Sequence, residues 1–311
     1  MKSDSFAFRT PNNQEIFVRR WQPDQGELRA SVQIAHGMTE HGQRYEPLAA
    51  LLVQSGCAVY ANDHRGHGKT AGEVEKLAYF ADANGWDLVV EDMAQLNRVI
   101  AEAHPAVPLF FLGHSMGALL VVDYLSRYGQ SVAGAVLSSL PSDPGALGNI
   151  ASLLANIQCW QKGRKSPSPL LNRLTFGKYN RPFAPNRTAF DWLSRDPAEV
   201  DQYVSDPFCG TVATAGFFVD LLYGAKRAHA QRVHASIPKA LPLFLLSGEN
   251  DPVTDCARSV IEIEKTLKNN GINDITVKIY PGARHEMLHE INRAEAMADI
   301  AAWIGRHLEP T

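Results

Sequence analysis

The sequence predicts an α/β fold, with helices on both faces of a mostly parallel central sheet. Short apolar runs that suit buried strands alternate with stretches of helical period along most of the 311 residues. Such alternation is typical of parallel strands joined by helical crossovers. It stops between residues 141 and 237, where prolines and aromatic residues are scattered and no clean strand is evident. We therefore predict one α/β core, residues 1–140 and 238–311, with a helical insertion over residues 141–237.

The core elements can be placed in order along the chain. The N-terminus is expected to form a hairpin from strands at 6–10 and 15–21 around a turn at 11–13. Six further apolar runs predict strands, at 31–35, 57–62, 108–112, 132–138, 241–247 and 274–280. Apolar residues recur with helical period in five stretches, which predict helices over 45–54, 87–103, 116–128, 254–269 and 287–308.

Composition limits the function classes. A formal net charge of −3 predicts neither a nucleic-acid surface nor an acidic tail. The four cysteines are scattered without a C-x-x-C pair, which is typical of a reduced, cytoplasmic protein. The first residues carry no apolar signal core, and no run is long enough to span a bilayer. We expect a soluble protein of the cytoplasm.

The stretch from Leu109 to Leu120 organises the chain around one serine. An apolar run suited to a buried strand leads into Gly113-x-Ser115-x-Gly117, and a helical pattern follows. A bare G-x-S-x-G pattern often marks only a glycine turn. Between a strand and a helix, however, it is typical of a nucleophile elbow, in which glycines permit a sharp turn that exposes the serine hydroxyl. Ser115 is therefore the predicted nucleophile.

A serine nucleophile needs a base, and the base needs a group that orients it. In an α/β sheet these partners are expected in loops after strands, in the chain order serine, acid, histidine. Asp251 follows the strand predicted at 241–247, and His285 follows the last strand. Asp251 could instead be only a helix cap, and Asp143 is the alternative acid.

An oxyanion requires backbone donors that are already in place. We expect the amide of Met116, at the start of the helix after the serine, to be one of them. The second donor is expected from the turn at residues 36–38, where Gly37 permits close approach, and we choose the amide of Met38. His36, His64 and His67 are expected to shape this loop, and the side chain of His114 to point away from the pocket.

Two other motifs resemble cofactor sites. Residues 285–289 match H-E-x-x-H, which binds zinc when it lies on a helix, but here the first histidine directly follows a strand and a turn. Residues 66–70 resemble the end of a phosphate loop, although Asp63 occupies the first glycine position. We expect no metal and no nucleotide cofactor.

Three core motifs stand after predicted strands: His36-Gly37-Met38-x-Glu40-His41-x-x-Arg44-Tyr45, Asp63-His64-Arg65-Gly66-His67-Gly68 and Gly113-His114-Ser115-Met116-Gly117. Together they resemble the monoacylglycerol lipase and lysophospholipase branch of the α/β-hydrolase superfamily, often grouped by sequence with serine aminopeptidases. The resemblance covers residues 5–308 and is weakest over the insertion. It implies a cofactor-free esterase that acts on small-molecule acyl esters, with the insertion as a cap over the active site and transient contact with lipid aggregates.

The aromatic residues of the insertion are candidates for a pocket roof that holds an acyl chain. We select Phe176, Tyr179, Trp192 and Phe217 as substrate-binding candidates; Phe183, Phe208, Phe218 and Tyr223 belong to the same set. The alternative is that these side chains only pack the insertion together. The sequence does not separate the two roles.

The leading hypothesis is a serine carboxylic-ester hydrolase that works through an acyl-enzyme. An aminopeptidase or amidase with the same triad is the first alternative, and it needs carboxylates to hold an amino terminus. Four acidic residues are available for that purpose: Glu40, Asp191, Asp196 and Glu199. A non-catalytic ligand-binding protein of the same fold is the second alternative. The serine at position 115 excludes a dehalogenase or an epoxide hydrolase, which need a carboxylate there.

Overall fold

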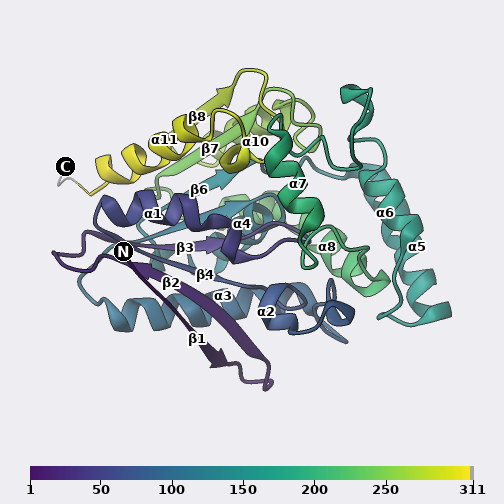
Figure 1. The fold of residues 1–311 in the computed structure, drawn as a ribbon, viewed down its shortest axis with the longest axis horizontal. Coiled ribbons are helices and arrows are strands. Elements are labelled where there is room, and N and C mark those ends of the chain that lie inside the picture. The colour runs from purple at the N-terminus through teal and green to yellow at the C-terminus, as the bar shows by residue number, and fades with distance from the viewer. Residues whose placement is uncertain (309–311) are drawn as a thin grey trace.

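The chain forms a single eight-stranded sheet (Figure 1). The structure, a computed structural model, describes residues 1–308, so the last three residues of the predicted core range lie outside it. The strands are β1 (Lys2–Arg9), β2 (Glu15–Gln22), β3 (Ala30–Ala35), β4 (Cys57–Asn62), β5 (Leu109–His114), β6 (Gly134–Ser138), β7 (Leu243–Gly248) and β8 (Ile275–Tyr280). Their order is β1-β2-β4-β3-β5-β6-β7-β8. Only β2 pairs antiparallel, with β1 and β4, so the predicted mostly parallel sheet is confirmed.

Helices cover both faces of this sheet because its central strands are apolar on both sides. Successive residues of β5 point to opposite faces. Phe110 packs with Trp303 of α11 (Arg293–Arg306) in one hydrophobic cluster, which also contains α1 (Glu46–Gln54). Phe111 belongs to the other cluster, with α3 (Gly85–Ala103) and α4 (Met116–Tyr128). Helix α10 (Arg258–Asn269) also contributes to this second cluster, where it packs on β7 and β8.

The segment between β6 and β7 is helical. Its helices are α5 (Gly145–Lys162), α6 (Pro169–Phe176), α7 (Pro197–Ser205), α8 (Ala215–Ala228) and α9 (Gln231–Ser236). Figure 1 shows α5 and α6 side by side at the right-hand edge, far from both termini. By contrast, α8 packs on α3 and α4, and α9 on α4, inside the main hydrophobic cluster. The segment thus contributes to the core as well as to the edge of the molecule, and its limits as a separate cap stay a prediction.

Two predicted helices begin later than the sequence pattern indicates. Residues 254–257 form turns before α10, and Met287–His289 form a 3-10 turn before α11 starts at Arg293. The second delay has a clear cause in the buried carboxylate of Glu290. It accepts hydrogen bonds from the amides of Arg195, Arg284 and Ile291, and these bonds hold the chain in a non-helical path.

Over residues 1–308, no helix is both long enough and apolar enough to cross a bilayer.

Candidate active site

Ser115 lies at a strained turn between β5 and α4. Its φ of 54° and ψ of −118° place a non-glycine residue in a backbone region that side chains rarely occupy. Its amide donates to the carbonyl of Ser138 at the end of β6, at 2.9 Å, which holds the turn in place. Gly117 is required for this geometry, because a Cβ there would lie 2.0 Å from the carbonyl oxygen of Ala35.

The structure brings Ser115, His285 and Asp251 into contact. Nε2 of His285 lies 3.0 Å from the hydroxyl oxygen of Ser115, and Nδ1 lies 3.0 Å from each carboxylate oxygen of Asp251. Asp251 is completely buried, and its Oδ1 also accepts the amide of Val253. Since a carboxylate only accepts, it holds the proton on Nδ1 and leaves Nε2 free to accept the proton of the serine. The alternative acid, Asp143, is exposed and accepts the amide of Gly145.

The electrostatic surroundings of His285 favour its protonated form. Burial alone would lower the pKa of this side chain. The charge and hydrogen bonds of Asp251, together with the charges of Glu286 and Glu40, outweigh burial and raise the pKa of His285 above its ordinary value. The base is therefore held by one carboxylate in contact and influenced by two others.

The two predicted oxyanion donors belong to the residue after Ser115 and to the turn after β3. Met116 is the first residue of α4, so its amide has no acceptor within the helix. Met38 and Gly37 line the same pocket as Ser115 and His285. The turn that carries them is held by His36, whose Nδ1 hydrogen-bonds the carbonyl of Gly37 at 2.7 Å. The roles of the two amides stay predictions.

Of the four histidines near the site, His114 differs from expectation. His114 does not point away, because its ring centroid lies 4.9 Å from that of His285. Burial, and then the charge of His285, lower its pKa to about 4, so it is neutral beside the base. His64 supports the turn through its amide, which donates to Nε2 of His36 at 2.9 Å. His67 packs its ring against His36, at 5.1 Å between centroids, and also against Phe80 and Phe217.

The pocket above Ser115 is roofed by two of the predicted aromatic residues. Phe176 and Trp192 line the pocket and stack at 6.1 Å, and Trp192 lies 5.1 Å from the ring of His285. Tyr179 packs behind Trp192 at 5.2 Å and is not part of the lining. The cavity volume is about 60 Å³. Tyr203 lines the same pocket. It was not among the predicted residues, because it belongs to no recognisable sequence motif.

The structure places Phe217 in the core and not in the lining of this pocket. It lies on the buried face of α8, completely inaccessible to solvent, and packs 4.7 Å from Phe80 in the main core. The helical period of α8 determines this position, because the side of the helix that faces α3 and α4 must be apolar. Aromatic character alone could not distinguish this packing role from substrate binding.

The four acidic side chains considered for an amino terminus are all engaged with protein groups. Glu40 accepts from the amide of Gly37, from Arg44 and from Tyr45. Asp191 accepts the amides of residues 187 and 188 and the hydroxyl of Thr188. Asp196 caps α7 and pairs with Arg293, whose guanidinium lies 3.7 Å from Glu199.

Nδ1 of His289 lies 3.6 Å from the carboxylate of Glu286, but the H-E-x-x-H residues otherwise face other protein groups. His285 contacts Ser115, Glu286 pairs with Arg44, and Nε2 of His289 lies 3.1 Å from the carbonyl oxygen of Arg44. Because the motif lies on a loop and a 3-10 turn, its histidines do not have the α-helical spacing of a zinc site.

One other group within residues 1–308 brings potential ligands together. Single ligand atoms of His41, Asp206 and Cys209 lie within 4.8 Å of one another. Nε2 of His41 is hydrogen-bonded to Asp206 at 2.9 Å, and burial raises the pKa of the Cys209 thiol, which keeps it protonated. In this structure the group is a hydrogen-bonded pair beside a half-buried cysteine.

The chain is similar to known proteins over most of its length. The family model described as "Serine aminopeptidase, S33" matches residues 26–292. The monoacylglycerol lipase of Mycolicibacterium smegmatis is 30% identical over 93% of this chain and 92% of its own length. The human monoglyceride lipase is 29% identical over 95% of this chain and 88% of its own length.

A solved structure extends the comparison to the fold. A thermostable carboxyl esterase from Bacillus coagulans, in complex with glycerol, superposes with a TM-score of 0.91 at 24% identity, over 99% of this chain and 100% of its own. The family model and the lipase relatives each span most of the chain, and the strained serine lies in contact with a histidine and a buried aspartate. The chain therefore belongs to the serine aminopeptidase S33 family of α/β-hydrolases, in its monoacylglycerol lipase-like branch.

Proposed function

We propose that this chain is a serine carboxylic-ester hydrolase that cleaves single-chain acyl esters through an acyl-enzyme. One observation carries the proposal: the hydroxyl of Ser115 lies 3.0 Å from Nε2 of a histidine whose other nitrogen is held by a buried carboxylate. That arrangement is what a serine needs in order to lose its proton as it attacks a carbonyl.

The first half of the reaction forms the acyl-enzyme. Ser115 attacks the ester carbonyl carbon while Nε2 of His285 takes the hydroxyl proton, and Asp251 stabilises the resulting imidazolium. The carbonyl oxygen becomes an oxyanion that accepts hydrogen bonds from the amides of Met38 and Met116. His285 then gives its proton to the departing alcohol oxygen as the carbon–oxygen bond breaks.

The second half repeats these steps with water. His285 takes a proton from the water as its oxygen attacks the acyl carbon, and returns that proton to Ser115 when the carboxylic acid leaves. The neutral ring of His114 beside His285 adds no second positive charge that would oppose this protonation.

An ester fits this site better than the amino-terminal substrate of an aminopeptidase. An aminopeptidase needs an unpaired carboxylate facing the pocket, to hold the positive amino group. Among the four acidic residues that were candidates, only Glu40 lines the pocket, and its two oxygens already accept three hydrogen bonds. The lipase relatives that cover most of this chain support the same choice.

The roof of the pocket is suited to an acyl chain. Phe176 and Trp192 present apolar rings next to His285, and each buried methylene contributes about 0.8 kcal/mol to binding. The cavity of about 60 Å³ is smaller than the ~300 Å³ that ligand sites usually reach, so a longer chain must displace part of the roof. Helix α6, which contributes Asn172 and Phe176 to the lining, has one buried residue, Leu171, and this is typical of a segment that moves at low cost.

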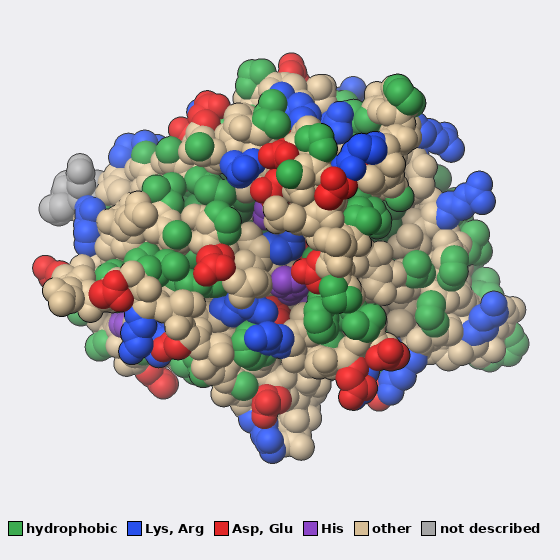
Figure 2. All heavy atoms as spheres, in the orientation of Figure 1, with side chains coloured by type: hydrophobic (Ala, Val, Ile, Leu, Met, Phe, Trp, Pro, Cys, Tyr) green, Lys and Arg blue, Asp and Glu red, His purple; other side chains and the backbone are tan. Residues whose placement is uncertain are grey.

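The outer face of the roof supports contact with lipid aggregates. Seven large apolar side chains are exposed there: Leu147, Ile150, Leu153, Ile157 and Trp160 of α5, and Leu170 and Leu174 of α6. Residues 144–190 also contain no acidic residue but seven basic ones: Lys162, Arg164, Lys165, Arg173, Lys178, Arg181 and Arg187. Figure 2 shows green and blue side chains next to one another along this right-hand edge. We call this surface the α5–α6 face.

A panel of substrates tests the proposed function. Nitrophenyl esters from acetate to long acyl chains, monoacylglycerol, lysophospholipid and aminoacyl amides are compared by kcat/KM. We expect kcat/KM to rise from acetate to at least a medium chain, and monoacylglycerol to exceed every amide. Ser115→Ala should abolish turnover without unfolding the protein, and a fluorophosphonate should label wild type at Ser115 alone. Preference for an aminoacyl amide, or labelling at another serine, would contradict the proposal.

A further inference from the structure

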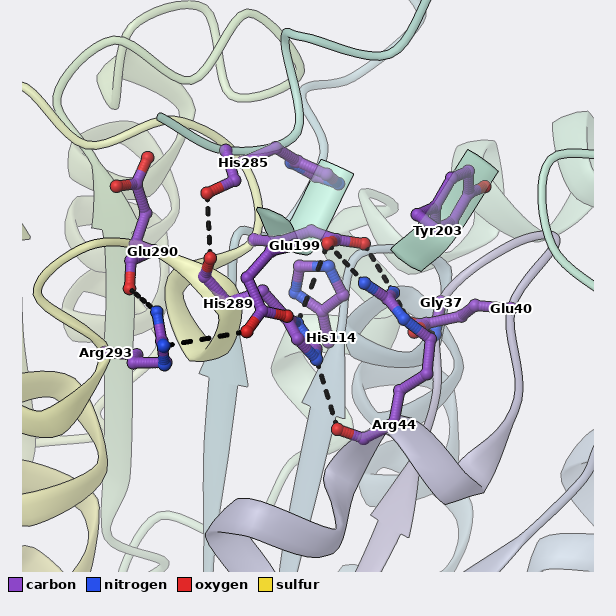
Figure 3. A network of polar contacts seen from close by, with 12 residues as sticks. Gly37, Glu40, Arg44, His114, Glu199, Tyr203, His285, His289, Glu290 and Arg293 are labelled. Carbon is purple, nitrogen blue, oxygen red and sulfur yellow. Dashed lines mark hydrogen bonds and ion pairs between the residues drawn. The ribbon is translucent and has the colours of Figure 1, made fainter. Parts of the chain in front are cut away.

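Arg44 connects two loops that are distant in sequence and adjacent in space. It lies in the 3-10 turn Gly42–Tyr45 after β3, next to Glu40 (Figure 3). Its guanidinium contacts both Glu40 and Glu286. Glu286 is 242 positions further along the chain and directly follows His285. One side chain thus reaches both the loop assigned to the oxyanion and the loop that carries the base.

The first contact fixes the oxyanion loop. Nη1 of Arg44 donates to one oxygen of Glu40 at 2.7 Å. The other oxygen accepts the amide of Gly37 at 2.6 Å and the hydroxyl of Tyr45 at 2.9 Å. Gly37 directly precedes Met38, whose amide is the proposed oxyanion donor. The Glu40 carboxylate therefore determines where the residue before that donor lies.

The second contact fixes the base loop. Two nitrogens of Arg44 donate to the two oxygens of Glu286, each at 2.7 Å. Such a planar pair restrains both the distance and the orientation of the carboxylate. The amide of Glu286 also donates to the carbonyl of Leu193 at 2.8 Å, so the chain just after His285 is held from two sides.

The three charges are out of reach of solvent. The side chains of Glu40, Arg44 and Glu286 are 3%, 10% and 6% exposed, and the guanidinium also packs over the ring of Tyr203 at 5.0 Å. A buried ion cluster of this kind often contributes little to stability compared with apolar residues of the same volume. Stability alone is therefore a weak reason for it, whereas placement of two catalytic loops is a specific one.

The cluster also has a net charge. Two carboxylates and one guanidinium leave one negative charge close to His285. Burial would raise the pKa of both carboxyls, but Arg44 holds the pKa of each below its ordinary value, so both remain ionised. The other groups packed around His285 are Asp251, Ser115 and the ring of Trp192. Two further histidines, His114 and His289, lie nearby, and burial lowers the pKa of both.

We propose that Arg44 is a positioning residue that clamps the oxyanion loop to the base loop through Glu40 and Glu286, and that the clamp supplies negative charge to the base. This inference rests on the proposed function and deepens it. Neither Arg44 nor Glu286 touches the reacting atoms; both act through Met38 and His285.

Two variants separate position from charge. Glu286→Gln keeps an acceptor for Arg44 but removes one carboxylate charge. We expect kcat to fall by about tenfold to a hundredfold with little change in KM, because a small misplacement of a base is costly. The acidic limb of its pH profile should move to lower pH. Arg44→Lys keeps the charge and loses the planar fork, so kcat should fall while the acidic limb stays in place.

Asp92→Asn is the matched control. Asp92, on α3, forms two hydrogen bonds with the guanidinium of Arg65. This pair is as buried as that of Arg44 and Glu286, since the side chain of Asp92 is 4% exposed and that of Arg65 is 3% exposed. Like Glu286→Gln, this change puts an amide opposite a buried guanidinium, and it should cost stability without changing kcat or the pH profile. Circular dichroism and thermal unfolding verify that all three variants fold.

The readouts are kcat and KM for a short nitrophenyl ester, and the pH dependence of Ser115 labelling by a fluorophosphonate, which does not depend on substrate binding. The proposal is overturned if Glu286→Gln and Arg44→Lys match the control in kcat, or if they change only KM. A wild-type protein that hydrolyses no ester and is not labelled at Ser115 would overturn the proposed function as well.

Discussion

The serine, the histidine and the aspartate come together because each lies just after the carboxyl end of a strand. Ser115 follows β5, Asp251 follows β7 and His285 follows β8; β7 and β8 are parallel neighbours, and only β6 lies between β5 and β7. Their carboxyl ends therefore meet along one edge of the sheet. The strained φ of Ser115 adds what the topology alone does not provide, because it directs the hydroxyl out of the turn toward the histidine.

The raised pKa of His285 predicts how activity depends on pH. The base accepts a proton from Ser115 only when it is neutral, and its pKa lies above the ordinary 6.5. We therefore expect kcat/KM for a short ester to fall as pH decreases through a value above 6.5, approaching a tenfold loss per pH unit. Rates measured by pH-stat between pH 5 and 9 test this, with circular dichroism to confirm folding. Constant kcat/KM down to pH 5.5 would contradict it.

The partners of the H-E-x-x-H residues predict independence from metal. Since His289 hydrogen-bonds the carbonyl of Arg44 and His285 faces Ser115, prolonged treatment with a chelator should leave ester hydrolysis unchanged. His285→Ala should reduce kcat by about a thousandfold or more, as expected for loss of the base in a triad. His289→Ala should cost far less. Inactivation by the chelator, reversed by added zinc, would replace the triad mechanism with a metal mechanism.

At the scale of elements, prediction succeeded where one local pattern decides the structure. Strands β3 to β7 are continuous apolar runs because both faces are buried, and β4 and α4 have the predicted bounds. The pattern predicted the start of α11 too early. Apolar residues recur with helical period before Arg293, but hydrogen bonds to the Glu290 carboxylate hold that stretch out of a helix.

Long-range contacts explain what the sequence could not provide. The misplacement of Phe217 followed from the orientation of α8, which depends on its packing on α3 and α4. The contact of Arg44 with Glu286 depends on the paths of two loops separated by most of the chain. By contrast, Ser115, Asp251 and His285 could be proposed together because each stands in a loop after a predicted strand. Their catalytic roles stay a prediction.

The α5–α6 face predicts selective binding to anionic lipid surfaces. Trp160 is 86% exposed and lies among basic residues, so it can enter the interface while they contact lipid headgroups. We expect tighter binding to phosphatidylglycerol vesicles than to phosphatidylcholine vesicles, and weaker binding as salt increases. Tryptophan fluorescence and vesicle co-sedimentation measure both effects.

Two substitutions and one control test this face. Trp160→Ala should weaken vesicle binding by about tenfold to a hundredfold, since burial of a large apolar side chain contributes about 1.5–3 kcal/mol. Lys162→Glu should reduce the preference for anionic vesicles. Ile291→Ala is the control, because Ile291 is exposed outside the segment between β6 and β7. Equal loss in Trp160→Ala and Ile291→Ala would mean that the α5–α6 face does not dock on lipid.

At the scale of the whole molecule, four buried histidines determine how the free energy of unfolding depends on pH in the acid range. Burial lowers the pKa of His64 to about 3 and those of His67 and His114 to about 4, and it places the pKa of His36 well below 6.5. These four rings are neutral in the folded protein at pH 5. In the unfolded chain they regain a pKa near 6.5 and take up protons.

This difference sets the sign of the pH dependence. Below pH 6.5 the unfolded state binds more protons at each of the four histidines, so each makes folding less favourable by about 1.4 kcal/mol per pH unit, down to its own folded pKa. Three groups oppose this effect. The pKa of His285 is raised, and burial raises the pKa of Asp92 and raises that of Asp220 to about 6, so all three bind protons more readily in the folded state. The histidines outnumber them, and stability should decrease from pH 6.5 toward pH 4.

Guanidinium unfolding at pH 8, 6.5, 5.5 and 5 measures this loss, and His67→Gln identifies its source. His67 is buried against Phe80 and Phe217, and its Nδ1 hydrogen-bonds the carbonyl of Arg65 at 2.8 Å, so the variant should be less stable than wild type even at pH 8. Because glutamine does not titrate, however, the variant should lose about 1.4 kcal/mol less per pH unit between pH 6.5 and 5. Wild type and variant losing stability equally steeply would show that His67 is protonated in the folded state, and that the charge is tolerated in the core beside the oxyanion loop.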